Sequence, residues 1–467
     1  MSKVGTTRSG STGDIVATAD PYTSVQVLAQ KGGFGVFAYN TGSQTWSERD
    51  GSSGHEKVAP DFMYNQAVTG TDAATPVWSY NPLKYWPNGI DAGNATDTPS
   101  NTATAGSGIQ YLSFFAYGPY VELSASPLTT TGITAINGRN TSGGAASEGN
   151  QKTGDPTISY TFAANSANTI VDQVDLLWGT RSATADYEES DGTPNDADDG
   201  GAYKDGANNF YNTDLTKQKT KDPTTSAQKV EFNFKHALAK LGGKNRLKVV
   251  LDLDGNGDGE TGATVTTKQA NTLVTIQSIQ IQNVANQFVQ SGVFDLATGT
   301  WDASLATVAE GAAVNLTFDR ATNIAMNSEI VEPASVPTWD GSAWSMTGVT
   351  TTATDVYSAS TGAPIFLIPS SANAQQLKVT VTYIVRTQDG NLAVPSGESA
   401  SCSKVTQTIT NTVTLPTDLI KPNKIITLVL HLGLTSVKFA ASVADWEEVN
   451  SANAKEVWLP SNVVVTP

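Results

Sequence analysis

The sequence predicts an all-β protein, and three observations support that class. The chain contains 41 Gly and 20 Pro among 467 residues and is rich in Thr, Ser and Asn, a composition typical of turns and strands. Apolar residues alternate with polar ones along many short segments, as in strands that bury one face. The chain is also too long for one ordinary hydrophobic core, so two or three domains are expected.

Charge and cysteine content narrow the possible functions. The formal net charge is −16, and no basic stripe is visible, which argues against a nucleic-acid partner. Cys402 is the single cysteine, so no intramolecular disulfide or cysteine zinc site can form, and a buried packing position is favoured. No apolar run approaches the roughly 18 residues of a membrane span. Because Met1–Val4 begins no signal peptide, we expect a mature form whose export signal has been removed.

In the N-terminal half, the first strand is predicted over 34–39, after the turn signal Gly32-Gly33. Further segments with strand character follow at 62–64, 111–117, 158–162 and 171–178. Residues 181–228 hold an acidic cluster without regular spacing. We interpret this stretch as a solvated surface loop or boundary region rather than a cation site.

The second half begins with a strand-like segment, Val230–Leu241. We therefore place a domain boundary near residue 226, which gives an N-terminal domain of 1–226 and a C-terminal domain of 227–446. Its further predicted strands are 247–251, 264–283, 313–318, 376–386, 404–414, 425–434 and 437–443.

Residues 447–467 are predicted to form a separate tail with one strand. Apolar side chains recur on one row of this tail, and a free apolar strand is an aggregation hazard unless something pairs with it. Pro460 cannot donate a hydrogen bond to a sheet, so the part after it is the stronger candidate for insertion. The candidate donor-strand residues are Val457, Leu459, Val463, Val464 and Val465.

One acidic string resembles a calcium loop. Asp254, Asn256 and Asp258 are two residues apart, as hard oxygen ligands of Ca²⁺ often are, and Asp252 offers an alternative start. Position twelve is not Glu in either register, so the bidentate ligand is missing. A solvated hairpin loop is therefore the favoured interpretation, with calcium as the alternative and no other cofactor expected.

An aromatic group raises the possibility of sugar binding. Trp78, Tyr80 and Trp86 could form a stacking platform, although large rings in β-proteins more often belong to the core. A carbohydrate-binding surface protein is therefore kept as an alternative function.

Signs of catalysis are absent from the sequence. His55, His236 and His431 are far apart and none belongs to an HExxH motif. No GxSxG or phosphate-loop motif occurs, and no GxGxxG stands at a predicted strand–helix junction. A β-sandwich glycoside hydrolase would need two converging carboxylates, which a sequence does not reveal. We therefore do not expect an enzyme.

Several segments, in order along the chain, resemble the fimbrillin family of the Bacteroidales, which comprises pilins and pilin-like surface proteins. These segments are Gly33–Tyr39, Tyr85–Pro87, Leu112–Tyr117, Val174–Leu177, Phe234–Leu241 and Lys424–Trp446. The Phe-Lys-His-Ala-Leu stretch and the Val-Ala-Asp-Trp ending are the more specific matches.

The resemblance implies two tandem transthyretin-like Greek-key β-sandwich domains with a C-terminal extension strand. It implies export as an outer-membrane-anchored lipoprotein, trimming after an Arg, and donor-strand polymerisation into a fimbria with other copies or related subunits. It also implies adhesion to a surface ligand, and the family includes tip and accessory adhesins that do not polymerise symmetrically. Arg8-Ser9 stands where the trimming site would be. No strand is recognisable before Arg8, so we expect a chain from which that strand is already gone.

Overall fold

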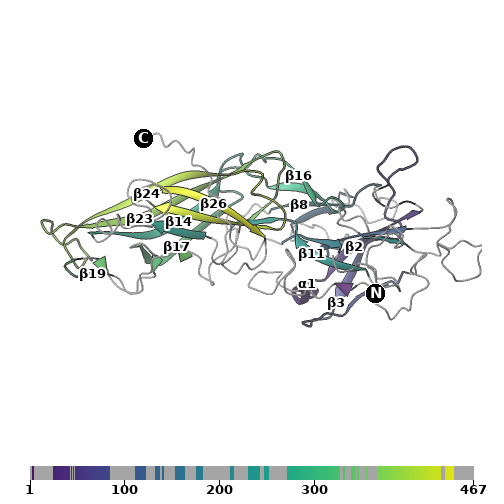
Figure 1. Ribbon diagram of the computed structural model, residues 1–467, viewed down its shortest axis with the longest axis horizontal. Helices are drawn as coiled ribbons and strands as arrows, with labels where there is room; N and C mark the ends of the chain where they lie inside the picture. The colour runs from purple at the N-terminus through teal and green to yellow at the C-terminus, as the bar shows by residue number, and fades with distance from the viewer. Residues whose placement is uncertain are drawn as a thin grey trace, which may run out of the picture.

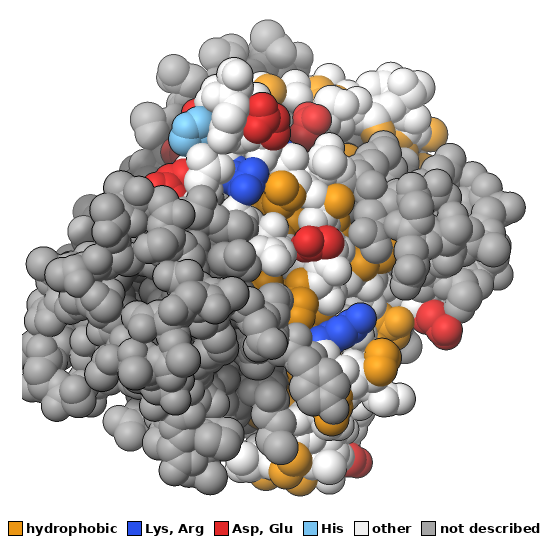
Figure 2. Space-filling view, turned by 90° about the vertical axis from the view of Figure 1, so that its right-hand side faces the viewer, with side chains coloured by type: hydrophobic (Ala, Val, Ile, Leu, Met, Phe, Trp, Pro, Cys, Tyr) orange, Lys and Arg blue, Asp and Glu red, His pale blue; other side chains and the backbone are white. Residues whose placement is uncertain are grey.

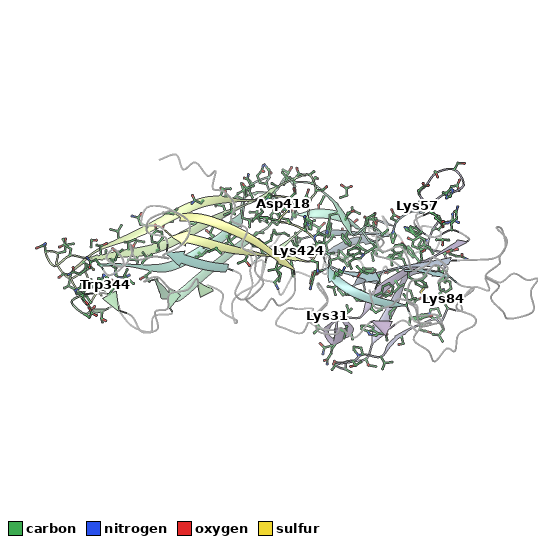
Figure 3. All side chains as sticks on the ribbon, viewed as in Figure 1. Lys31, Lys57, Lys84, Trp344, Asp418 and Lys424 are labelled. Atoms are coloured by element: carbon green, nitrogen blue, oxygen red, sulfur yellow. The ribbon has the colours of Figure 1, made fainter. Side chains whose placement is uncertain are left out.

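The computed structural model shows an elongated molecule with sheets at both ends (Figure 1). Trp344 lies near one end of the long axis and Lys84 near the other (Figure 3). The structure describes residues 3–4, 25–42, 44, 46, 48–84, 111–122, 132–136, 139–140, 153–162, 175–181, 211–214, 230–241, 247–251, 271–326, 330–331, 338–342, 344–345, 354–355, 365–432 and 437–445.

The prediction of an all-β protein is confirmed, and the described part of the chain adds one short helix, α1 (Val25–Gln30). Sheet I lies at the right-hand end of Figure 1 and has the strand order β1-β11-β9-β5-β2-β3-β4, with β10 also on β5. Its strands are β1 (Lys3–Val4), β11 (Glu231–His236), β9 (Leu177–Arg181), β5 (Tyr111–Gly118), β2 (Phe34–Gly42), β3 (Met63–Gly70), β4 (Trp78–Tyr80) and β10 (Tyr211–Asp214).

Sheet II packs against one face of sheet I. Trp178 of sheet I and Phe294 of sheet II meet edge to face, with ring centroids 5.6 Å apart. The order of sheet II is β16 (Thr300–Ala303), β15 (Ser291–Asp295), β8 (Thr157–Thr161), β6 (Ile133–Ile136) and β7 (Arg139–Asn140). The opposite face of sheet I has a second core, which Leu28 of α1 helps to fill.

Sheets III and IV form the other end of the molecule. Sheet III has the order β21 (Thr354–Asp355), β13 (Leu247–Leu251), β25 (Lys424–Leu432), β12 (Ala239–Leu241) and β22 (Ile365–Leu367), with β26 (Val437–Asp445) also on β25. Sheet IV has the order β18 (Ile330–Val331), β17 (Asn315–Met326), β14 (Thr272–Asn283), β23 (Gln375–Gln388) and β24 (Cys402–Leu415). A separate hairpin joins β19 (Thr338–Trp339) and β20 (Trp344–Ser345). Alternate residues of β23 are buried, as the period-2 pattern predicts, and they share a core with β25.

The predicted boundary near residue 226 does not separate these sheets. β11, which lies beyond it, pairs antiparallel with β9 inside sheet I, and β15 pairs with β8 inside sheet II. Strands on both sides of residue 226 therefore complete the first pair of sheets. Alternation reveals that a segment is a strand, but it does not reveal which sheet the strand joins.

The chain crosses from sheet I to sheet III through Ala237 and Leu238, which join β11 directly to β12. The crossing is held by backbone and side-chain bonds: Ala237 N donates to Leu176 O at 2.7 Å, and Trp301 Nε1 donates to Ala237 O at 2.7 Å. Beside it, His236 Nδ1 and Asp175 Oδ2 form a buried hydrogen bond. The segment predicted to open the second domain thus forms the connection between the two pairs of sheets.

Candidate functional site

The candidate site is the edge of sheet I at β11, where a very short strand pairs with it. β1 runs parallel to β11, with Lys3 opposite Glu231 and Val4 opposite Phe232. Among the described strands, none lies beyond β1 in this sheet, and the pairing on that side of β11 stops at Phe232. The remainder of β11 is therefore edge strand.

Aromatic rings lie directly beside this edge. Phe232 and Phe234 alternate along β11 and are buried, and both contact Phe34 of β2, with ring centroids at 6.0 and 5.1 Å. Trp78 of β4 meets the same Phe34 ring at 5.0 Å. We call these four residues the phenylalanine cluster. Such edge-to-face and tilted ring contacts add to the burial of large apolar surfaces, so the cluster anchors β11 in the sheet.

The predicted turn Gly32-Gly33 places α1 over the same face of sheet I. Gly33 has φ +81°, and a Cβ there would lie 2.0 Å from the carbonyl oxygen of Val68, so no side chain fits. Gly33 N donates to Leu28 O at 2.8 Å, which closes the helix end and sets Leu28 into the core.

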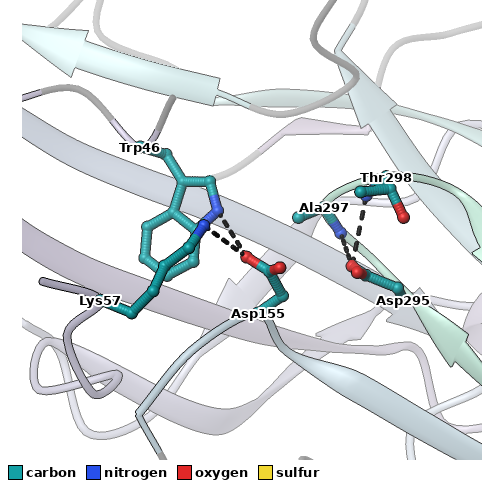
Figure 4. A network of polar contacts seen from close by, with 6 residues as sticks. All are labelled: Trp46, Lys57, Asp155, Asp295, Ala297 and Thr298. Atoms are coloured by element: carbon teal, nitrogen blue, oxygen red, sulfur yellow. Dashed lines mark hydrogen bonds and ion pairs between the residues drawn. The ribbon is translucent and has the colours of Figure 1, made fainter. Parts of the chain in front are cut away.

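A network of polar contacts ties loops of sheet I to sheet II (Figure 4). Asp155 Oδ1 accepts hydrogen bonds from Trp46 Nε1 and Lys57 Nζ, both at 3.0 Å, and Lys57 Nζ lies 4.8 Å from the Trp46 ring centroid. Asp295 accepts from the backbone N–H groups of Ala297 at 2.7 Å and of Thr298 at 3.2 Å. Burial, and then the charge of Asp155, raises the pKa of the Asp295 carboxyl.

This polar network is structural in character. Lys57 already neutralises Asp155, and the described residues contain no group of three or more His, Cys, Asp or Glu that could hold a metal ion. No chemistry beyond the tying of loops follows from its geometry.

Of the aromatic residues predicted to bind sugar, Trp78 is only 4% exposed and packs in the phenylalanine cluster. Its ring therefore offers no face to a sugar. Tyr80 is partly buried, and Trp86 lies outside the described residues.

Of the other predicted positions, one lies within the described part of the chain and the rest lie outside it. Cys402 is free and buried, as expected. Three predicted groups lie outside the described part of the chain: the calcium-like residues Asp252, Asp254, Asn256 and Asp258, the processing site Arg8-Ser9, and the donor-strand residues Val457, Leu459, Val463, Val464 and Val465.

The expectation that no strand precedes Arg8 is wrong, because β1 pairs with β11. Two residues are too few for an alternation pattern, so no local signal marks this strand in the sequence. Figure 2 views this end of the molecule, where hydrophobic side chains lie among scattered charged ones. Among the described residues, no helix has the length and apolar character needed to cross a membrane.

Comparisons with known proteins place these features in context. No family model matches the chain. It is 31% identical over 180 residues to the fimbrium subunit Fim1C of Phocaeicola vulgatus, a match covering 38% of this chain and 36% of that protein's length.

Among solved structures, a fimbrial protein from Bacteroides vulgatus matches with a TM-score of 0.51 at 20% identity, over 93% of this chain and 99% of that one. A putative cell adhesion protein from Parabacteroides distasonis matches with a TM-score of 0.36 at 8% identity over 95% of each chain, which is too distant to define the fold.

Proposed function

Because these comparisons support a protein of the fimbrillin family, we propose that the chain is a structural fimbrial subunit that polymerises by donor-strand exchange. A fimbrial role at the cell surface is supported by the relatives' names. The observation that carries the finer proposal is β1, a two-residue strand held on the edge of sheet I four positions before Arg8-Ser9 in the sequence.

Cleavage after Arg8 would separate β1 from the rest of the chain. A strand of two residues forms few backbone hydrogen bonds, so once cut it would leave the sheet readily. The whole of β11 would then be an open edge, next to the buried Phe232 and Phe234. An exposed edge of this kind favours the addition of another strand.

The tail at 447–467 has the chemistry for that role. Residues 457–465 could extend about 30 Å at about 3.3 Å per residue, more than the six residues of β11 require. Each buried Val or Leu would contribute about 1.5–3 kcal/mol before the cost of ordering the tail. The tail of one subunit would replace β1 of the next.

A synthetic peptide of residues 447–467 tests this step without polymerisation. We expect it to bind a chain that lacks residues 447–467 and has been cut after Arg8, and to bind the uncut chain much more weakly because β1 blocks the edge. The control peptide carries Val463→Asp and Val465→Asp, which place charges where apolar side chains should be buried. Equal binding of both peptides, or of cut and uncut chains, measured by calorimetry, would contradict the proposal.

A further inference from the structure

The long edge strand β24 (Cys402–Leu415) lies at the other end of the molecule from the candidate site. It pairs with β23 over fourteen consecutive positions without a register shift, and Figure 1 shows the two strands side by side. β24 is the last strand of sheet IV, and no described strand pairs with its outer edge.

This edge lacks the features that usually protect a strand from pairing with another chain. Residues 404–408 are exposed on both faces of the strand, and Val405 is 46% exposed. The strand has neither Pro nor Gly, and its one charged residue is Lys404, near one end. A long, regular edge of β-branched residues is a site for strand addition.

The sequence of β24 suggests which strand is added. Residues 405–413 read Val-Thr-Gln-Thr-Ile-Thr-Asn-Thr-Val, which is the same in both directions apart from the exchange of Gln and Asn. Antiparallel pairing matches the first residue of one strand with the last of the other. Two copies related by a two-fold axis at Ile409 would therefore place Thr406 opposite Thr412 and Val405 opposite Val413.

We propose that β24 is a self-association surface, where it pairs antiparallel with β24 of a second copy about an axis at Ile409. A two-fold interface requires a self-complementary surface, and this palindrome supplies one. The proposal uses no residue of β1, β11 or the tail, so it stands independently of donor-strand exchange.

Cross-strand contacts of the kind that this dimer would use already occur between β23 and β24 within one subunit. Thr380 and Thr410 are joined through their Oγ1 atoms at 3.0 Å, and Thr382 and Thr408 at 3.2 Å. The same Thr–Thr pairing across the two-fold axis would extend this ladder from one copy to the next. On the other face, the exposed Val405 would gain contacts with the second copy.

The lack of charge along β24 favours its association with a second copy. The chain carries a net charge of −16, so two copies repel each other, but residues 405–413 contain no charged side chain. One pair of strands buries less than the roughly 1,200 Å² of a stable interface, so free subunits should associate weakly. Subunits repeated along a fibre would associate more strongly through avidity.

Charge substitutions at a facing pair test the proposal. Thr406 and Thr412 are both exposed on the outer face, so changing them should not disturb folding. The double variant Thr406→Lys, Thr412→Lys sets like charges opposite each other twice, at about 0.2–1 kcal/mol each, and should weaken the dimer about tenfold. The matched variant Thr406→Lys, Thr412→Glu sets opposite charges in the same places and should restore it.

Sedimentation velocity of the full chain over a range of concentrations measures the dimer. A wild-type chain that stays monomeric throughout, or a Lys/Lys variant that dimerises like the wild type, would overturn the proposal. A dimer that forms only after removal of residues 447–467 would also overturn it, because the tail would then cover the edge.

Disulfide trapping tests the register. With Cys402→Ser in the background, Ile409→Cys should cross-link two copies on oxidation, because the two-fold axis brings residue 409 opposite itself. Thr406→Cys faces Thr412 instead and should not cross-link. Equal cross-linking by both variants would contradict pairing about Ile409.

Discussion

Glu398 belongs to the loop that joins β23 to β24, and its side chain is only 1% exposed. Its Oε2 accepts from Arg386 Nε at 2.8 Å, and its Oε1 pairs with Lys404 Nζ at 2.6 Å. Arg386 also donates to Thr275 Oγ1 at 2.8 Å, which links the loop to β14. Burial opposes the charge of Glu398, but the hydrogen bonds from Arg386 and Lys404 outweigh it and hold the pKa below its usual value.

The lowered pKa of Glu398 predicts how stability depends on pH. A carboxyl with a depressed folded pKa contributes stability above its unfolded value of about 4.3, and this contribution is lost as the pH falls through the folded pKa. Glu398→Gln leaves Arg386 buried without its partner and should lower the free energy of unfolding by about 3 kcal/mol at neutral pH. The deficit, measured by urea denaturation, should shrink in acid.

Glu310→Gln is the control for this prediction. Glu310 pairs with Lys378 but is 47% exposed, so its loss should cost less than about 1 kcal/mol. An equal loss of unfolding free energy in Glu398→Gln and Glu310→Gln would contradict the importance of the buried network.

Asp295 predicts the opposite dependence on pH. Because burial and the charge of Asp155 raise its pKa, the ionised carboxylate is disfavoured in the fold. The cost is fully present above the folded pKa and absent below the unfolded value of about 3.9. Asp295→Asn keeps an oxygen for the N–H of Ala297, so it should raise the melting temperature at neutral pH and leave it unchanged in strong acid. A lower melting temperature at neutral pH would contradict this.

At the residue scale, the sequence predicts whether a side chain is buried better than it predicts which residue that side chain contacts. Cys402 was expected in a packing position and is buried. The sequence is compatible with Trp78 in the core or in a sugar platform, and the residue lies in the core. The buried pairing of His236 with Asp175 joins residues 61 positions apart, so no local pattern could reveal it.

At the scale of elements, the crossing from β11 to β12 fixes the two pairs of sheets to each other. Asn423, which lies before β25, accepts from His236 N at 3.2 Å and donates from its own N to Leu238 O at 3.1 Å. Trp301 of β16 reaches the same segment through the Ala237 carbonyl. Elements from three sheets therefore converge on this connection.

Trp301→Phe tests the importance of the crossing. The ring packing would remain, but the buried Ala237 carbonyl would lose its 2.7 Å hydrogen bond, at a cost of about 1–3 kcal/mol in the free energy of unfolding. Trp339→Phe, at a partly exposed position in the distal hairpin, should change it less. Denaturant unfolding that ranks the two variants in the reverse order would contradict this role of Trp301.

The strands that the sequence predicts well are those with long, clean alternation. The segments predicted at 376–386 and 404–414 correspond to β23 and β24. By contrast, β10 lies within the stretch interpreted as a loop and pairs with β5. Its four residues, like the two of β1, are ordered by a neighbouring strand rather than by a local pattern, so only the fold reveals them.

For the whole molecule, the fold class was predictable and the division into domains was not. The β15–β16 hairpin lies after the first strands of sheet III in the sequence but belongs to sheet II. Whether a hairpin joins the nearer or the more distant pair of sheets depends on three-dimensional packing. Neither composition nor turn signals reveal it. It also implies that the two halves cannot be separated cleanly at residue 226.

In the proposed assembly, cleavage after Arg8 opens the edge of β11 and the tail of another copy closes it. The most direct measurement compares three proteins by electron microscopy and by ladders in SDS gels: the uncut chain, the chain cut after Arg8, and the cut chain without residues 447–467. We expect fibres and ladders from the cut chain with its tail and from neither of the other two proteins. Fibres from the cut chain that lacks residues 447–467 would contradict it.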